Sequence, residues 1–414
     1  MIFRKDAERA GALSEGGSAV DLRARRAAEA RRARRWAVAL SAAFALAVVV
    51  LTVVLALAAG AVSGEGGAVD SGAAPEVATG HEVTDALGRC VTVPDDPARI
   101  AVFDSFSGEM AIMAGAGDRI VGLPAGVKSD RMLMAMKPAL NPDAATLSGS
   151  AVNIETLMAL DCDVALVKTS LSADEAAKLD AAGIPYVAVG YTSVDEQMAA
   201  MELVGEVCGR DPAEKAARLV AYYREVAALV AEHAAALEQE GVEPVRVYHA
   251  INDVLLTDGA GSLGADWIQR VGCVDVSAGQ EPTSGTDYAT TLEQIYVWQP
   301  ELIVCNARDA ALAFSQDTAW AQLPAVASGN VRIIPTGATR WGQRGSVETY
   351  LAMLWLGTVA YPEAYADVDL RATVGAYYRD FFEVEVTDEL WESMLAGTDI
   401  RATGTGDGSG GGTQ

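Results

Sequence analysis

The sequence has few residues of the kinds that build metal centres and active sites. It contains three histidines, His81, His233 and His249, and no two of them have the spacing of metal ligands. Its five cysteines match no zinc motif and no redox pair. Neither a nucleophile elbow nor a phosphate-binding glycine loop is present. We therefore expect a protein that is not an enzyme and that has no intrinsic cofactor or metal site.

Basic residues are also scarce, because 31 Lys and Arg stand against 56 Asp and Glu. The deficit is larger than the total suggests. Residues 1–35 carry ten Lys or Arg and five Asp or Glu, which leaves 21 basic against 51 acidic residues (31 − 10 and 56 − 5) in the rest of the chain. A region with a net charge of about −30 repels the phosphate backbone, so nucleic acid is not expected as a partner.

Charge is absent altogether from residues 36–62, directly after the basic N-terminus. A bilayer core of about 30 Å needs about 20 apolar residues, so this segment is long enough to span a membrane. The preceding arginines place the N-terminus in the cytoplasm by the positive-inside rule. The small residues at 59–61 leave a second interpretation open, a cleaved export signal. Either way, we expect the bulk of the protein to lie outside the cytoplasmic membrane.

Helical segments rich in Ala and Glu alternate with runs rich in Val and Ile through most of the chain. This alternation predicts an α/β fold with parallel sheets. With about 150 residues per domain, 414 residues predict two or three domains. After a hairpin at 82–94, for example, the pattern predicts a buried strand at 99–103, a loop at 104–107 and a helix at 108–116.

One helix and strand occur twice, at residues 153–167 and 291–305, with a spacing of 138 residues. In each copy apolar residues recur at i, i+3 and i+6, and an aliphatic run follows. Glu155 and Glu293 stand at the same place near the start of the two helices. The duplication predicts two similar lobes, each with one glutamate at this point.

Residues 211–239 have the pattern of a single helix about 40 Å long, with Asp211 as the expected N-cap and Pro212 in the first turn. A helix of this length suits a strut between two lobes better than a crossover within one sheet.

These features together resemble the substrate-binding proteins of ABC importers for iron complexes and vitamin B12, over about residues 82–390. The resemblance rests on the duplicated elements, on residues 203–210 before the long helix and on residues 341–362. It implies two parallel-sheet α/β lobes joined by one long rigid helix, with a metal-chelate ligand in the cleft between them. The implied ligand is a ferric siderophore, haem or a corrinoid, and the implied partner is an ABC permease with its ATPase. A membrane-tethered sensor or adhesion module with the same fold is the alternative from another class.

On this basis the chain divides into seven parts, and we expect it to be a monomer. They are a basic cytoplasmic N-terminus (1–35), a transmembrane anchor or signal (36–62), a flexible linker (63–81), an N-terminal binding lobe (82–210), a connecting helix (211–239), a C-terminal binding lobe (240–395) and a disordered tail (396–414).

Ligand contacts are expected in the loops that follow parallel strands, which form the natural crevice of such sheets. The candidate residues in these loops are Ser105, Phe106, Lys128, Tyr191, Asn252, Tyr288, Arg308, Arg340, Trp341 and Arg344. The last three are the most informative, since two arginines could hold carboxylates or catecholates while the indole covers an apolar face. A solvated turn with one buried anchor is the other interpretation.

The resemblance also assigns Glu155 and Glu293 to docking on arginines of the permease, one glutamate per lobe. The alternative is that each glutamate only offsets a helix macrodipole. His249, at a strand end near the predicted crevice, has two interpretations as well: an axial haem ligand or a packed strand histidine.

Overall fold

The computed structural model describes residues 80–128, 133–134, 139–148 and 152–397. No helix among these residues is both long and apolar enough to cross a bilayer. The predicted membrane span at 36–62, the linker before residue 80 and the tail from residue 398 lie outside them.

The first described element is an antiparallel hairpin, β1 (Gly80–Thr84) and β2 (Cys90–Pro94), as the sequence predicts. Gly88 in its turn has a φ of +75°, which glycine adopts without strain. The Asp85 carboxylate accepts hydrogen bonds from the backbone N–H groups of Leu87 and Arg89, which fixes the turn. The turn also reaches the first sheet, because the N–H of Ala86 donates to the carbonyl of Ala188 at 2.9 Å.

The first large sheet has five parallel strands in the order β5-β4-β3-β6-β7. The strands are β3 (Ile100–Val102), β4 (Ile120–Pro124), β5 (Ala145–Leu147), β6 (Val164–Lys168) and β7 (Tyr186–Val189). The helices of this half are α2 (Ser105–Met113), α3 (Ala125–Lys128), α5 (Ile154–Leu160), α6 (Ala173–Ala182) and α7 (Val194–Val207), with a short 3-10 turn η1 (Gly117–Arg119). β3, β4 and β7 are buried along their whole length and β6 up to Lys168, as expected of a parallel sheet with both faces covered.

The second large sheet has four parallel strands in the order β10-β8-β12-β13. They are β8 (Arg246–Ala250), β10 (Val274–Asp275), β12 (Leu302–Cys305) and β13 (Val331–Ile333). A separate antiparallel pair is formed by β9 (Leu256–Asp258) and β11 (Asp287–Ala289). The helices are α9 (Leu263–Arg270), α10 (Leu292–Trp298), α11 (Arg308–Gln316), α12 (Pro324–Ala327), α13 (Thr349–Ala360), α14 (Leu370–Phe382) and α15 (Asp388–Leu395), with a 3-10 turn η2 (Thr318–Trp320). The predicted α/β class with parallel sheets is confirmed.

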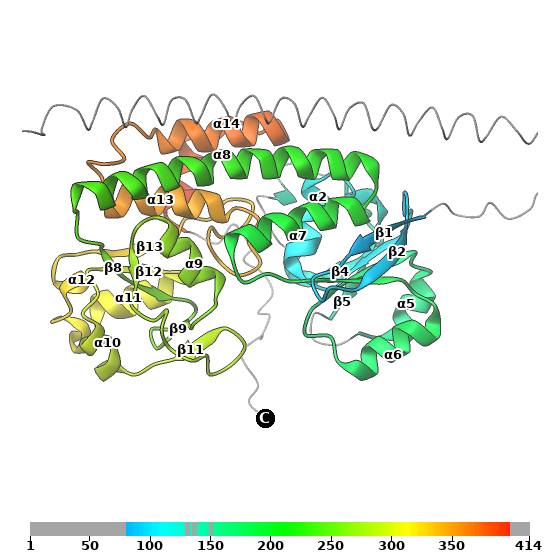
Figure 1. Cartoon of the computed structure of the whole chain (residues 1–414), viewed down its shortest axis with the longest axis horizontal. Coiled ribbons are helices and arrows are strands. Elements are labelled where there is room, and N and C mark those ends of the chain that lie inside the picture. Colours follow the sequence, from blue (N-terminus) through cyan, green and yellow to red (C-terminus); the bar gives the residue numbers. More distant parts are fainter. Residues whose placement is uncertain (1–79, 129–132, 135–138, 149–151, 398–414) are drawn as a thin grey trace, which may run out of the picture. The chain divides into compact units, whose positions relative to one another are not determined.

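Between the two sheets the chain runs through α8 (Arg210–Glu240), a helix of 31 residues. At 1.5 Å per residue it is about 46 Å long. It lies alongside α7 toward one end and α13 toward the other (Figure 1). The sequence predicts its ends to within one residue, but the N-cap is Gly209, with a φ of +109°, and not Asp211, which lies in the first turn.

One hydrophobic cluster joins α8 to helices of both halves. It includes Met110 of α2, Val204 of α7, Val220 of α8, Trp267 of α9 and Leu354 of α13. Burial of apolar area is the main stabilising term in folding, so α8 is held along its length by a core that it shares with both sheets.

Four local differences from the sequence prediction affect the candidate residues. The helix α2 begins at Ser105 and not at residue 108, because the Asp104 carboxylate accepts from the N–H of Ser107 at 2.8 Å and caps the helix early. Ser105 and Phe106 are therefore in the first turn of a helix. Tyr288 lies in a strand, β11, Arg308 is the first residue of α11 and Lys128 is the last residue of α3, so none of these three is in a loop.

Candidate ligand site and matched surface helices

The segment after β13, residues 336–346, is called the ligand loop here, because it carries Arg340, Trp341 and Arg344. Trp341 is fully buried, with 0% of its surface exposed. Gly342 has a φ of +69°, and its carbonyl accepts from the indole N–H of Trp267 at 3.0 Å. In this conformation the Trp341 indole packs in the core. Its contact with a ligand stays a prediction, one that requires the loop to open.

A buried carboxylate shapes this loop from beneath. Glu348 has no exposed surface, and its Oε2 accepts from the N–H of Thr339 at 2.8 Å and from the Thr339 hydroxyl at 3.1 Å. Its Oε1 accepts from the Tyr378 hydroxyl of α14. The hydroxyls of Thr339 and Ser346 lie 2.7 Å apart, which closes the loop on itself. The loop is thus fixed by buried hydrogen bonds, which are stronger in a low-dielectric interior.

The two arginines of the loop are closer to solvent than its tryptophan. Arg340 is half-buried and donates to Oε1 of Gln343 at 3.1 Å. The side chain of Arg344 is 53% exposed and pairs with Asp287, which begins β11. An exposed pair of this kind contributes little to stability, so Arg344 is available to exchange Asp287 for an anionic ligand.

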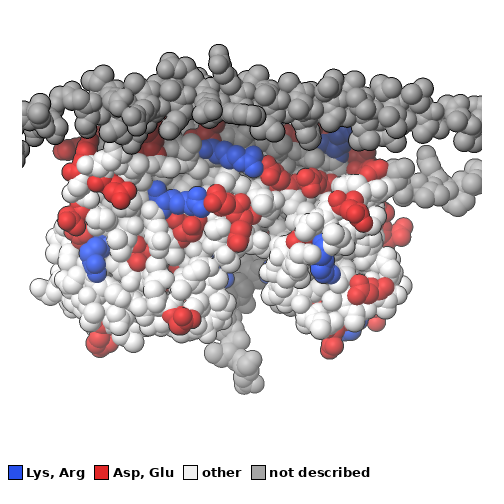
Figure 2. Space-filling view, viewed as in Figure 1, with Lys and Arg blue, Asp and Glu red and all other residues white. Residues whose placement is uncertain are grey.

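Residues of the first half meet the ligand loop through Tyr191, which follows β7. Its ring lies 4.6 Å from that of Phe106, and its hydroxyl accepts from the N–H of Gly345 at 3.1 Å. Burial raises the pKa of the Tyr191 phenol, so it stays protonated and able to donate. The structure therefore brings Phe106 and Tyr191 next to the loop that carries the three residues predicted from its sequence. Figure 2 shows the surface hollowed between the parts that hold the two sheets.

Within the described part of the chain, the other predicted ligand residues form no hydrogen bond or ion pair with this loop. Lys128 ends α3 and donates to the carbonyl of Ala144. Ser105 is partly buried in the first turn of α2, and Asn252 and Arg308 are exposed. Tyr288 packs against Trp298 with ring centroids 6.2 Å apart. Their part in ligand binding stays a prediction.

His249 is 2% exposed, and both of its ring nitrogens are occupied within the protein. Nδ1 lies 2.7 Å from Asp258 and Nε2 lies 3.0 Å from Oδ1 of Asn306. Burial alone would lower the pKa of His249, but the Asp258 carboxylate beside it and the hydrogen bond to Asn306 raise it overall. This arrangement favours the packed strand histidine over the haem ligand. Across the described residues, no group of three His, Cys, Asp or Glu is placed to hold a metal ion.

The buried carboxylates near His249 were not found from the sequence. Asp275, at the end of β10, is 4% exposed, and burial raises its pKa to about 6 although the backbone and hydroxyl of Ser277 bond to it. Acidic residues of short strands and loops look like surface residues in a sequence. Only the fold shows that these ones are buried.

The surface elements that carry Glu155 and Glu293 are matched in detail. Both glutamates are exposed in the first turn of α5 and α10. The helices are capped by other side chains, since Asn153 accepts from the N–H of Thr156 at 3.0 Å and Thr291 from the N–H of Gln294 at 3.2 Å. In the part of the chain that the structure describes, neither glutamate forms a hydrogen bond or ion pair. Capping therefore does not account for them.

The match extends to the far end of both helices. Asp161 and Gln299, which are 138 residues apart, are left-handed C-caps with φ of 47° and 48°. Arg99 donates to the carbonyl of Leu160, and Arg246 donates to the equivalent carbonyl of Trp298.

The next strand is fixed in the same way in both copies. Asp163 accepts from the backbone N–H of Arg99 at 2.9 Å, and Glu301 accepts from that of Arg246 at 3.1 Å. Each helix also exposes an apolar side chain, Met158 at 64% and, one position later in the repeat, Val297 at 73%. The two copies thus present similar surfaces, which the sequence pattern alone did not show at this depth.

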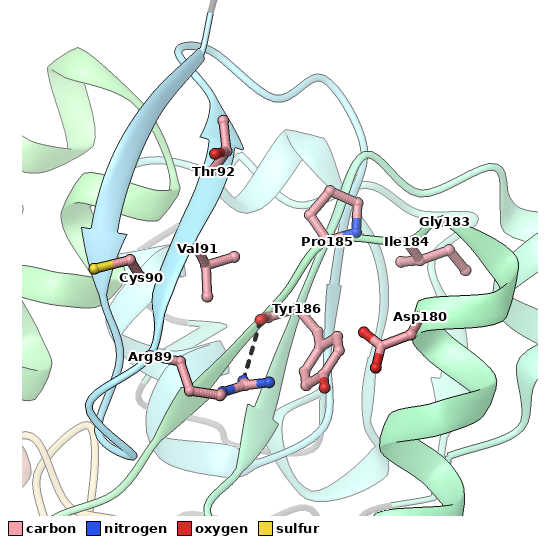
Figure 3. Close-up of a pocket in the computed structure, with 9 residues that line it drawn as sticks. All are labelled: Arg89, Cys90, Val91, Thr92, Asp180, Gly183, Ile184, Pro185 and Tyr186. Atoms are coloured by element: carbon pink, nitrogen blue, oxygen red, sulfur yellow. Dashed lines mark hydrogen bonds between the residues drawn. The ribbon is translucent and has the colours of Figure 1, made fainter.

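A pocket of about 410 Å³ lies elsewhere, between β2, β7 and the end of α6 (Figure 3). The Arg89 guanidinium lies 4.3 Å from the ring centre of Tyr186 and 2.6 Å from Asp85. Asp180 and Cys90 line the same pocket. Because no predicted ligand residue lines it, this pocket is not the candidate ligand site.

A second pocket, of about 480 Å³, lies beside the C-terminal end of α8 and is lined by His233, Glu240 and Tyr361 among others. The His233 ring stacks on Tyr365 at 4.2 Å. This pocket also contains no predicted ligand residue.

Comparison with known proteins agrees with the α/β fold described above. The family model described as periplasmic binding protein matches residues 100–338. The molybdate-binding protein MolA of Haemophilus influenzae is 27% identical over 324 residues, which are 72% of this chain and 90% of that protein. The solved structure of MolA bound to molybdate matches with a TM-score of 0.64 at 24% identity, and the match covers 74% of this chain and 99% of that chain. A periplasmic solute binding protein of Veillonella parvula has the same TM-score and identity, with 78% and 98% covered.

Proposed function

The chain belongs to the periplasmic binding protein family, and we propose that the ligand it captures is an anionic iron chelate, a ferric siderophore or haem. Members of this family are extracytoplasmic components of ABC importers. They bind a small molecule and deliver it to a permease, and they are not enzymes. The fold and the transport role follow from the family, and the ligand is the proposed part.

The ligand loop is the observation that carries this proposal. It is fixed by buried bonds at Thr339 and Ser346, and it presents Arg340 and Arg344 near the surface. A guanidinium forms paired hydrogen bonds to carboxylate, catecholate and propionate oxygens, which are the outer groups of iron chelates and haem. Phe106 and Tyr191, which reach the same loop, add aromatic surface for an organic ligand.

A smaller oxyanion of the molybdate type is the second candidate. It is favoured by the 27% identity to a molybdate-binding protein. The same arginines would bond its oxygens, but an oxyanion leaves the aromatic residues without a role. Cobalamin, which carries no comparable array of anionic oxygens, is the third.

A panel of ligands separates these candidates. The protein without residues 1–79 would be heated with ferric siderophores, haem, molybdate, sulfate and cobalamin in turn. A ligand that binds only the folded state stabilises it by RT ln(1 + [L]/Kd), about 2.7 kcal/mol at a hundredfold excess over Kd. Stabilisation by molybdate and not by any iron complex would contradict the iron proposal. The variant Arg344→Ala should lose most of the ligand-induced rise in melting temperature. Without ligand, its melting temperature should equal that of the wild type.

We also propose that α5 and α10 dock on the permease, and that residues 36–62 tether the protein, as a monomer, to the membrane. Both glutamates are exposed and neither caps its helix, and the geometry around them is the same in both copies. These observations support the docking part of the proposal. Like charges placed across an interface cost several kcal/mol and slow encounter. The double variant Glu155→Arg with Glu293→Arg should therefore abolish uptake in cells, while ligand binding in solution stays within about a few-fold of wild type.

The matched control reverses two other exposed acids, with Asp180→Arg on α6 and Glu363→Arg after α13. It changes the net charge by the same amount and should leave uptake intact. Normal uptake by the glutamate double variant would show these carboxylates to be ordinary residues of a helix start. If both double variants lose uptake, net charge and not the docking helices is responsible.

A further inference from the structure

A chain of buried hydrogen bonds links α8 to the ligand loop through one glutamine. The Tyr223 hydroxyl of α8 donates to Oε1 of Gln197 at 2.7 Å, and Nε2 of Gln197 donates to the backbone carbonyl of Ser346 at 2.7 Å. Tyr223 and Gln197 have no exposed surface, and Ser346 is 2% exposed. Gln197 lies in the second turn of α7, so the bond to Ser346 joins residues 149 positions apart.

The neutral amide of Gln197 suits this place for a chemical reason. One end must accept a hydrogen bond from a phenol and the other must donate one to a carbonyl, and an amide offers both from one planar group without any change of charge between pH 5 and pH 8. A carboxylate would direct an oxygen at the Ser346 carbonyl, and an apolar side chain would leave both partners unsatisfied. A buried group without its partner costs the full desolvation penalty.

The loop end that Gln197 holds is the end next to the candidate site. Gly345, one residue before Ser346, donates its N–H to the Tyr191 hydroxyl. The Ser346 hydroxyl continues the chain, because it contacts the Thr339 hydroxyl at 2.7 Å and accepts from the N–H of Glu348 at 2.9 Å. Two successive residues of the loop are therefore tied to the first half of the molecule, and the same loop is anchored to its own half by Glu348.

We propose that Gln197 is a positioning residue that sets the ligand loop against α7 and α8, so that the loop and the long helix hold one another in register. The proposal rests on the assignment of this loop to ligand binding. The predicted effect does not depend on any ligand. Removing the hydrogen bonds of Gln197 should free the ligand loop while the rest of the fold remains intact.

Hydrogen–deuterium exchange of the ligand-free full chain tests this. In Gln197→Glu the new carboxyl should be ionised at about pH 8 and protonated at about pH 5, because burial raises a carboxyl pKa. Protonated glutamic acid can replace the amide, since its hydroxyl donates to Ser346 and its carbonyl accepts from Tyr223. The other groups that face this position, Tyr191 and Tyr223 with their phenols, do not titrate in this range. Asp195, Asp266 and Arg270 form ion pairs at the contact between α7 and α9, and Glu348 bonds to the loop itself. All four are present in wild type, so the comparison with wild type at the same pH removes their effect.

At pH 8, exchange in peptides that cover residues 337–348 should be roughly tenfold faster than in wild type, which is the factor expected for one lost buried hydrogen bond. At pH 5 it should equal the wild-type value at that pH. The control Gln269→Glu, the same change at an exposed position of α9, should show no rise at either pH. Should Gln197→Glu fail to fold, Tyr223→Phe, which removes one bond and leaves the loop bond, should give a smaller rise confined to the same peptides.

Wild-type exchange in the loop of Gln197→Glu at pH 8, or a rise spread evenly over the whole chain, would overturn the proposal. A rise that pH 5 does not reverse would do the same, since it would indicate a general packing defect. Because the experiment needs no ligand, its outcome is distinct from that of the ligand panel. The absence of any thermal shift in the panel would contradict the proposed function alone.

Discussion

Replacing Trp341 by alanine is expected to destabilise the fold more than any other single change in the ligand loop. The indole is fully buried in the hydrophobic cluster that α8 shares with both sheets. A buried tryptophan covers roughly 150–250 Å², or about 4–6 kcal/mol at about 25 cal/mol per Å². The indole N–H has no hydrogen-bond partner among the described residues, so the loss is one of packing. Measured values for such truncations are about 3–5 kcal/mol, and we expect this range.

Urea denaturation of the protein without residues 1–79, followed by circular dichroism, measures this change directly. The midpoint should fall while the slope stays near the wild-type value, because the same surface is exposed on unfolding. The matched control is Trp391→Ala on α15, where the indole is only partly buried. It should cost about 1–2 kcal/mol, since less apolar surface is lost.

The result that would refute this reasoning is a Trp341→Ala variant with a wild-type denaturation midpoint and no ligand binding. It would show that the indole leaves the core in the working protein and covers the ligand, as the sequence alone suggested. A variant that is both destabilised and unable to bind would be ambiguous, so binding must be compared at a urea concentration where both proteins are folded.

Three further outcomes are expected. Because burial raises the pKa of Asp275 to about 6, the native state holds this proton more tightly than the unfolded chain does. The protonated carboxyl contributes its full stabilisation, at most about 3 kcal/mol, below about pH 4, and this contribution is lost as the pH rises through 6. In Asp275→Asn the free energy of unfolding should therefore change less between pH 4 and pH 7 than it does in wild type, about 3 kcal/mol less at most. Asp85→Asn breaks the pairing with Arg89 and should speed hydrogen exchange in residues 80–94 without changing the exchange of the second sheet. Ligand binding should change the angle between the lobes only slightly, because α8 shares its core with both, and a change of tens of degrees by small-angle scattering would contradict this.

The sequence predicts this fold well where the apolar periodicity and the capping residues indicate the same helix ends. The ends of α8 fall within one residue of the prediction, and Gly241 ends it in the left-handed conformation that glycine favours. The duplicated helices begin and end at the predicted places, because the apolar stripe is clear and Asn153 and Thr291 are good caps.

The sequence fails where tertiary contacts decide. Tyr288 is predicted in a loop but lies in β11, because a three-residue strand carries too little alternation to be recognised. Trp341 stands between two arginines and near two glycines, a pattern typical of a surface loop, yet it is buried. Gln197 and Glu348 look like helix-surface residues, and only their partners across the chain show that they are buried. Polar residues in the core are the least predictable part of a candidate site, because their burial depends on partners far away in the sequence.

The local geometry of α5 is repeated in α10, and this repetition is more informative about function than either helix alone. A left-handed conformation at a residue other than glycine costs roughly 1–2 kcal/mol, and both Asp161 and Gln299 adopt it at the same point. In both copies an arginine at the start of the neighbouring strand bonds the last carbonyls of the helix. The N-caps are other side chains, Asn153 and Thr291, so N-capping does not account for the two exposed glutamates. The repeated left-handed turn and the repeated arginine contact give each helix the same orientation relative to its neighbouring strand, which is what the proposed docking of both glutamates on one partner requires.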